Sequence, residues 1–196
     1  MSKVEAIRWR DSRLFLLDQR LLPGREEWIE ISTLDAAIDA IFQLVVRGAP
    51  AIGITAAYAG VIAARTRGQD RYGWDTDLER LEAARPTAVN LRWALQRMRR
   101  VLDAGQAPAA GLERLQAEAE RIHAEDRAGN LCMAEAGSAL IEPGSRVLTH
   151  CNTGSLATGG TGTALGVIVR GFRDGRIEEV YACETRPWFQ GLRLTA

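Results

Sequence analysis

The sequence has few of the residues on which metal centres and disulfide frameworks depend. It contains three cysteines, Cys132, Cys151 and Cys183, and two histidines, with no C-x-x-C pair and no Cys/His cluster. An odd number of widely spaced cysteines predicts reduced thiols rather than disulfides. The same scarcity argues against a structural zinc site, and we expect no metal ion.

An excess of one charge is also lacking. Lysine plus arginine and aspartate plus glutamate number 25 each in 196 residues, which favours neither nucleic acid nor an anionic membrane as a partner. The sequence begins without an apolar signal-peptide core, and its longest apolar run, residues 49–64, is too short and too rich in alanine and glycine to cross a bilayer. We therefore expect a cytoplasmic protein without nucleic-acid or membrane partners, in which this run forms a helix buried on all sides.

Residues 4–31 have the pattern of a small antiparallel β-meander. Strand-like stretches are separated by polar turns and by Pro23-Gly24, and we expect strands at 4–9, 13–17 and 28–31. After them the apolar period becomes helical. Residues 32–35 cap a helix whose buried side is expected to hold Leu34, Ile38, Ile41, Phe42 and Val45.

Further helices are predicted along the chain. Pro50 suits the first turn of a helix through the apolar run. Helical periodicity also marks residues 77–84, 91–102 and 111–140. In the last of these helices, one side is expected to hold Leu112, Leu115, Ile122 and Met133. Asp126 and Asn130 fall on the same face, where we expect them to form hydrogen bonds inside the bundle.

Glu142-Pro143-Gly144 is the clearest boundary in the sequence. After it, one βαβ unit is predicted from strand 146–150, helix 162–172 and strand 177–183. One such unit is too little for a parallel sheet, which helices normally cover on both faces, so we expect a piece of a longer polypeptide. The predicted class is α/β, with an N-terminal β-meander and helical domain at 1–143 and the start of a Rossmann-like parallel domain at 144–196.

Cys151 is placed where open α/β sheets bind their ligands, after a strand and before a glycine-rich loop. Backbone N–H groups of such a loop, and of the helix after it, can hold a phosphate. The loop lacks the third glycine of the dinucleotide fingerprint and the Gly-Lys of a triphosphate loop. The alternatives are a tight turn and a cysteine that only packs. His150 is not expected to serve as its base, because adjacent strand residues point to opposite faces.

Four segments together resemble one family. They are Arg47-Gly48-Ala49-Pro50-Ala51-Ile52-Gly53 with Ala56-Ala57-Tyr58, Arg85-Pro86-Thr87-Ala88-Val89-Asn90-Leu91, Thr149-His150-Cys151-Asn152 with its glycine loop, and Glu184-Thr185-Arg186-Pro187 with Gln190-Gly191. In this order they resemble the methylthioribose-1-phosphate isomerases, which are aldose–ketose isomerases of methionine salvage and relatives of the regulatory subunits of translation initiation factor 2B. The resemblance covers essentially the whole chain, and the family's members are considerably longer.

The resemblance implies a reaction and a site. The reaction converts 5-methylthioribose 1-phosphate to 5-methylthioribulose 1-phosphate in a homodimer, without a cofactor. The implied substrate-binding residues are Arg47, Gly48, Ala49, Arg85 and Gln190, and Cys151 is implied to stabilise the transition state. The family's proton-donor aspartate belongs to a later Gly-Ala-Asp-Arg-like segment that residues 1–196 lack, so we expect this piece alone to be inactive.

Alternatives remain for the arginines and for the substrate. Each arginine could be a solvated surface charge, although both stand at helix breaks with free backbone N–H groups, which favours phosphate binding. An isomerase of ribose 1,5-bisphosphate and a non-catalytic regulatory subunit are alternatives within the same fold. The aromatic Trp188 and Phe189 suit a thioether better than a second phosphate.

Overall fold

The structure, a computed structural model, describes residues 4–195 of the chain. Its first part is a three-stranded antiparallel meander, β1 (Ile7–Arg10), β2 (Arg13–Leu17) and β3 (Trp28–Ile31), as the sequence predicted. The register pairs Ile7 with Leu16 and Leu14 with Ile31, and all four side chains are buried. One face of the meander is therefore apolar and packs against the helices.

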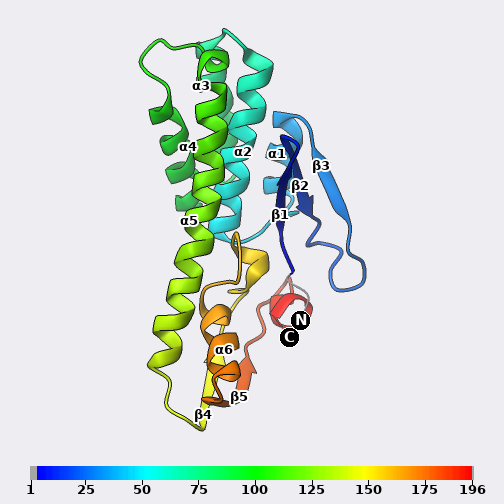
Figure 1. The fold of residues 1–196 in the computed structure, drawn as a ribbon. Coiled ribbons are helices and arrows are strands. Elements are labelled where there is room, and N and C mark those ends of the chain that lie inside the picture. The colour runs from blue at the N-terminus through cyan, green and yellow to red at the C-terminus, as the bar shows by residue number, and fades with distance from the viewer. Residues whose placement is uncertain (1–3, 196) are drawn as a thin grey trace.

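Five helices form a bundle beside the meander (Figure 1). They are α1 (Leu34–Phe42), α2 (Ala49–Arg67), α3 (Arg71–Ala83), α4 (Val89–Val101) and α5 (Leu112–Ala139), the last preceded by a short 3-10 turn, η1 (Pro108–Gly111). The predicted cap of α1 is confirmed, since Thr33 Oγ1 accepts the N–H of Ala36 at 3.2 Å. Helix α3 begins at Arg71 rather than at residue 77, because the Asp70 carboxylate accepts the N–H of Gly73 at 2.8 Å and caps an earlier turn.

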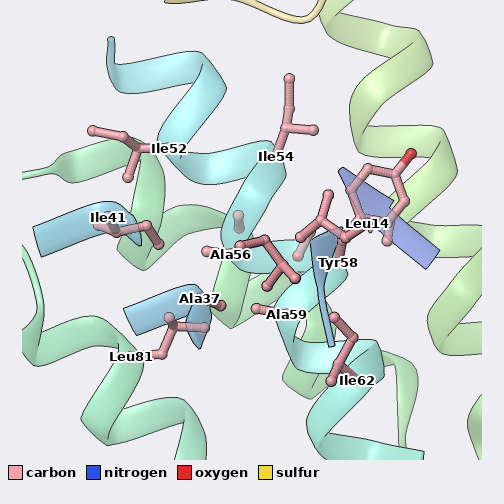
Figure 2. Close-up of a cluster of buried hydrophobic side chains, with 14 of the residues drawn as sticks. Leu14, Ala37, Ile41, Ile52, Ile54, Ala56, Tyr58, Ala59, Ile62 and Leu81 are labelled. Atoms are coloured by element: carbon pink, nitrogen blue, oxygen red, sulfur yellow. The ribbon is translucent and has the colours of Figure 1, made fainter. Parts of the chain in front are cut away.

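Helix α2 runs through the middle of this bundle. All residues from Ala51 to Ala64 are buried, so the predicted helix buried on all sides is confirmed. Figure 2 shows why: side chains from α1, α3 and β2 surround it. Pro50 occupies the first turn, where its missing N–H costs no hydrogen bond, and Gly48 precedes the helix with a φ of 88°.

Two apolar side chains lie outside the core in which the helical period placed them. Phe42 is 63% exposed, because α1 ends there and Leu44, with a φ of 60°, turns the chain so that Val45 is buried instead. Met133 is 46% exposed on α5. At this end of α5 the neighbouring α6 (Ala164–Arg173) covers a different side, where Val167 fits against Gly137.

The C-terminal part is one βαβ unit made of β4 (Ser145–Thr149), α6 and β5 (Ile177–Ala182), with parallel strands. Helix α5 reaches from the bundle to this unit and packs against α6 along its second half (Figure 1). The predicted α/β class is thus confirmed. The division at residues 143 and 144 stays a prediction, because α5 packs in both parts.

The length and hydropathy of the helices decide whether any of them could span a membrane. Of the helices within residues 4–195, none combines the length and the hydropathy needed to cross a membrane.

Candidate active site

Cys151 lies just beyond the carboxyl end of β4, which points toward the helical bundle (Figure 1). Its φ is 65°, a left-handed conformation that is uncommon and strained for a residue with a side chain. The thiol is exposed, and its S–H donates to Gln190 Oε1 at 3.4 Å. The structure therefore brings together Cys151 and Gln190, two residues that the resemblance implies for the site. In the sequence they come before α6 and after β5.

The glycine-rich loop that follows, residues 152–163, is closed on itself at its base. The carbonyl oxygen of Thr153 accepts the N–H of Thr163 at 2.8 Å, and Gly154 forms a bridge with Gly162. Gly162 has a φ of 92°, and a Cβ there would lie 2.6 Å from the Gly154 backbone, so a side chain cannot be accommodated. The loop is a compact lobe whose base adjoins Cys151.

The start of α2 packs against the middle of this loop, at the turn η2 (Ser155–Ala157). A Cβ on Gly48 would lie 2.5 Å from Ala157, so only glycine allows the two backbones to approach this closely. Gln19 adds a second connection, since its Nε2 donates to the carbonyl oxygen of Leu156 at 2.8 Å. Gly48 and Ala49, which the resemblance implies as substrate-binding residues, thus lie beside the loop that follows Cys151.

Arg47 is buried and retains an unused donor. Its Nε donates to the carbonyl oxygen of Leu44 at 3.3 Å, whereas its buried Nη1 has no partner among the described residues. The guanidinium lies 5.4 Å from the ring centre of Trp188, and burial together with the charge of Arg193 lowers the pKa of Arg47. An anion placed here would satisfy the free donor and offset the crowding of positive charge.

The segment that carries Gln190 is fastened to the β-meander by Arg193, in the turn η3 (Gly191–Thr195). Its Nη2 donates to the carbonyl oxygens of Gln19, Arg20 and Leu22, at 3.2, 2.7 and 2.9 Å. These bonds join backbone groups that are far apart in the sequence, and they place the turn beside Arg47.

Glu184 and Thr195 fix the same segment from within. The Glu184 carboxylate accepts the N–H groups of Gly191 and Leu192 at 2.9 and 3.1 Å. Partial burial opposes ionisation of Glu184, but these bonds and one from the Thr185 N–H outweigh it and lower its pKa. Thr195 Oγ1 contacts the carbonyl oxygens of both Cys151 and Gln190 at 3.3 Å, so the two candidate residues share an anchor.

Arg85 lies at the same end of the bundle but apart from this cluster. It stands half-buried in the turn between α3 and α4, and its guanidinium forms no hydrogen bond or ion pair within residues 4–195. The turn is close to the start of α2, since a Cβ on Gly53 would lie 2.8 Å from the carbonyl oxygen of Asn90. The structure thus does not join Arg85 to Cys151 or Arg47 by any contact.

The described residues hold no group of three or more histidine, cysteine, aspartate or glutamate side chains that could bind a metal ion. All three cysteines are free. No sequence pattern indicated Arg193, His123 or Arg127, each of which bonds to backbone far away along the chain. No local signal marks such residues, because an arginine that binds distant carbonyls looks like any surface arginine.

The chain is similar to known proteins in sequence and in fold. Residues 45–196 match the model of the initiation factor 2 subunit family. The chain belongs to this family. Two members with similar sequences are named methylthioribose-1-phosphate isomerase: one from Thioalkalivibrio sulfidiphilus is 57% identical over 98% of the chain, and one from Ectopseudomonas mendocina is 53% identical over 100%. The chain spans 56% and 57% of their respective lengths.

Two solved structures have the same fold as this member of the initiation factor 2 subunit family. The 5-methylthioribose 1-phosphate isomerase from Pyrococcus horikoshii OT3 matches with a TM-score of 0.88 and 34% identity, over 98% of this chain and 56% of that one. The delta subunit of the translation initiation factor eIF-2B from A. fulgidus matches with a TM-score of 0.80 and 42% identity, over 98% of this chain and 58% of that one. The family therefore includes proteins named as enzymes and proteins named as initiation-factor subunits.

Proposed function

We propose that the whole protein is an aldose–ketose isomerase that converts 5-methylthioribose 1-phosphate to 5-methylthioribulose 1-phosphate. The observation that carries this proposal is the 57% identity, over 98% of the chain, to a relative named methylthioribose-1-phosphate isomerase. The contact between Cys151 and Gln190, beside a buried arginine with a free donor, supports it.

Arg47 is proposed to bind the substrate phosphate. Its guanidinium lies 5.4 Å from the ring centre of Trp188, its buried Nη1 has no partner among the described residues, and a guanidinium presents a planar fork of donors that matches phosphate oxygens. Gly48 and Ala49 add backbone at the start of α2, where N–H groups have no partner inside the helix. Arg85 is proposed to reach the substrate from the adjacent turn.

The chemistry must begin on a closed sugar ring, because the phosphate on the anomeric oxygen blocks simple opening to a free aldehyde. The ring oxygen has to gain a proton as its bond to C1 breaks, and a hydrogen then moves from C2 to C1 while the C2 hydroxyl loses its proton and becomes the ketone. The proton gained by the ring oxygen equals the one lost by the C2 hydroxyl, so the reaction is internally balanced and needs no cofactor. Charge develops in both steps, and preorganised donors such as Cys151 and Gln190 would stabilise it. The proton-donor aspartate implied by the resemblance lies outside residues 1–196.

We further propose that the protein acts in methionine salvage, in the cytoplasm and as a homodimer. The pathway follows from the proposed reaction. The cytoplasm follows from the substrate, because a phosphorylated sugar does not cross membranes unaided. The homodimer rests on the resemblance alone.

A regulatory binding subunit is the second candidate, favoured by the 42% identity to the eIF-2B delta subunit. The test is to incubate the whole protein with 5-methylthioribose 1-phosphate and to follow the aldose and ketose signals by NMR. Ketose formation supports the isomerase. Binding of the sugar phosphate without turnover favours the regulatory subunit, and selective turnover of ribose 1,5-bisphosphate would assign the other isomerase activity.

A further inference from the structure

Gly159, in the glycine-rich loop, is held by three side chains of α5. Its N–H donates to Asp126 Oδ2 at 2.7 Å. Its carbonyl oxygen accepts a hydrogen bond from Arg127 Nε at 2.7 Å and lies 3.1 Å from His123 Nε2. We call these three side chains the Gly159 clamp. Both polar groups of one loop residue are thus bound by a helix that belongs mostly to the bundle.

The tautomer of His123 follows from its partners. Tyr58 OH lies 3.1 Å from His123 Nδ1, and burial raises the pKa of Tyr58, so the hydroxyl keeps its proton and donates it. Nε2 then carries the ring hydrogen and donates to the carbonyl oxygen of Gly159. Burial, helped by the charge of Arg127, lowers the pKa of His123 and keeps the ring neutral. Tyr58 is fixed in turn by stacking on Trp9, with ring centres 4.5 Å apart.

Gly159 is also packed closely against the bundle. A Cβ on Gly159 would lie 2.6 Å from His123 Cδ2 and 2.9 Å from Ile54 Cδ1. The base of the same loop is pinned where Thr153 bonds to Thr163, two residues after Cys151. The loop is therefore held both at its base and near its middle.

We propose that the Gly159 clamp is a positioning device for the active site, which sets where the loop places Cys151 relative to Gln190 and Arg47. The inference rests on the proposed isomerase function, because it assigns the clamp a role in that reaction. The three side chains bind the loop from the α5 side and do not contact Cys151. They are positioning residues, whose loss should slow turnover more than it weakens substrate binding.

The first arm of the test measures kcat and KM of the whole protein with 5-methylthioribose 1-phosphate. His123→Ala and Arg127→Met are expected to lower kcat at least about tenfold while KM changes less than about threefold. His123→Gln keeps a donor toward the Gly159 carbonyl and should recover most of the lost kcat. Arg121→Met is the matched control, because Arg121 lies on the same helix and pairs with Glu118 and not with the loop.

The second arm needs no substrate. The rate of alkylation of Cys151 by iodoacetamide, followed by peptide mass spectrometry, should change at least about threefold in His123→Ala and Arg127→Met, and not in Arg121→Met. If the wild-type protein fails to turn over the substrate, the proposed function falls while this arm still decides on the clamp. The inference would be overturned by wild-type kcat together with an unchanged alkylation rate in the clamp variants. It would also be overturned if His123→Gln melts like the wild type but does not restore the lost kcat.

Discussion

The helical bundle with its meander, residues 4–139, and the βαβ part, residues 145–195, differ in how they bury apolar surface. In the first, α2 is buried from Ala51 to Ala64 by side chains of its neighbours. In the second, Leu148 is 70% exposed and Tyr181 is 47% exposed on the two paired strands. The bundle therefore closes a core of its own, whereas the βαβ part exposes much of its two-stranded sheet.

The candidate site draws on both parts in different ways. The bundle contributes Arg47 and the start of α2, which burial holds in place. The βαβ part contributes the exposed Cys151, in a strained backbone conformation. Strain of this kind persists only where the surroundings enforce it. We propose that the enforcing contacts include the bonds from Arg193, in η3, to the loop between β2 and β3, and the Gly159 clamp on α5. Within residues 4–195, the less buried part thus carries the candidate residue Cys151, and the more densely packed part supplies contacts to the segments around it.

The largest expected effect is on kcat. It tests whether Cys151 affects turnover without affecting stability. Cys151→Ala should lower kcat by about 100- to 1,000-fold, the usual cost of losing one transition-state donor, with little change in substrate binding. The melting temperature should stay the same, because the exposed thiol makes a single side-chain bond. Cys132→Ala, which alters another exposed cysteine on α5, serves as the control and should change neither. Near-wild-type turnover of Cys151→Ala would assign that cysteine to packing.

The next effect is on stability and should be confined to the bundle. Leu81→Ala removes a fully buried side chain and should cost about 2–5 kcal/mol of unfolding free energy. Leu148→Ala, tested in residues 1–196 by themselves, removes a comparable side chain from β4, where it is 70% exposed, and should change stability by no more than about 0.5 kcal/mol. Chemical denaturation of both variants measures the difference. Equal losses would mean that Leu148 is covered in solution and that the two parts are packed alike.

Much of the fold could be predicted because it depends on local patterns in the sequence. The alternation of the meander, the cap at Thr33 and the apolar run inside α2 each depend on neighbouring residues, and each is confirmed. The errors at Phe42 and Met133 have another origin. Helical spacing predicts which residues share a face, but whether another element covers that face depends on tertiary packing.

The candidate site was less accessible to such reasoning. The place of Cys151 after a strand could be read from the sequence, and the resemblance named its companion Gln190, which the structure puts in contact with it. The free donor of Arg47 and the bonds of Arg193 could not be predicted, because they join segments that only the folded chain brings together. The roles of these residues in binding and catalysis are predictions, and the Cys151 and Arg47 variants test them.

A smaller effect is expected where the two parts meet, at Arg47. Arg47→Lys should raise KM about tenfold. The planar guanidinium of Arg47 has several nitrogens and leaves Nη1 free for an anion, whereas the ammonium group of a lysine is a single nitrogen. Titration with inorganic phosphate should show the same weakening without any turnover. Arg25→Lys, at an exposed arginine that pairs with Glu27, is the matched control and should leave KM unchanged. An unaltered affinity in Arg47→Lys would assign this arginine to the structure of the bundle alone.

The smallest effect compares one acid group from each part. Asp77, in the bundle, accepts hydrogen bonds from Arg67 Nε and Nη2 at 2.7 and 2.9 Å, which lower its pKa below the usual 3.8 against the opposing effect of burial. Because the folded state holds this proton less tightly than the unfolded state, the stabilisation is present above about pH 4 and is lost as the pH falls through the folded-state pKa. Asp77→Asn should therefore cost about 1 kcal/mol at pH 7, or about 2–4 °C of melting temperature, and flatten the loss of stability in acid.

Asp174, in the βαβ part, accepts hydrogen bonds from Ser138 and Arg170, and these lower its pKa in the same direction. Its side chain is 34% exposed, against 5% for Asp77, so water screens its interactions more strongly. Asp174→Asn should consequently shift the melting temperature at pH 7 less than Asp77→Asn does, and leave the acid limb of the stability curve nearly unchanged. Thermal melts of both variants between pH 3 and pH 7 measure this. A larger effect at Asp174 would show that the contact between α5 and α6, which Ser138 and Asp174 join, contributes more to stability than the ion pairs of the bundle.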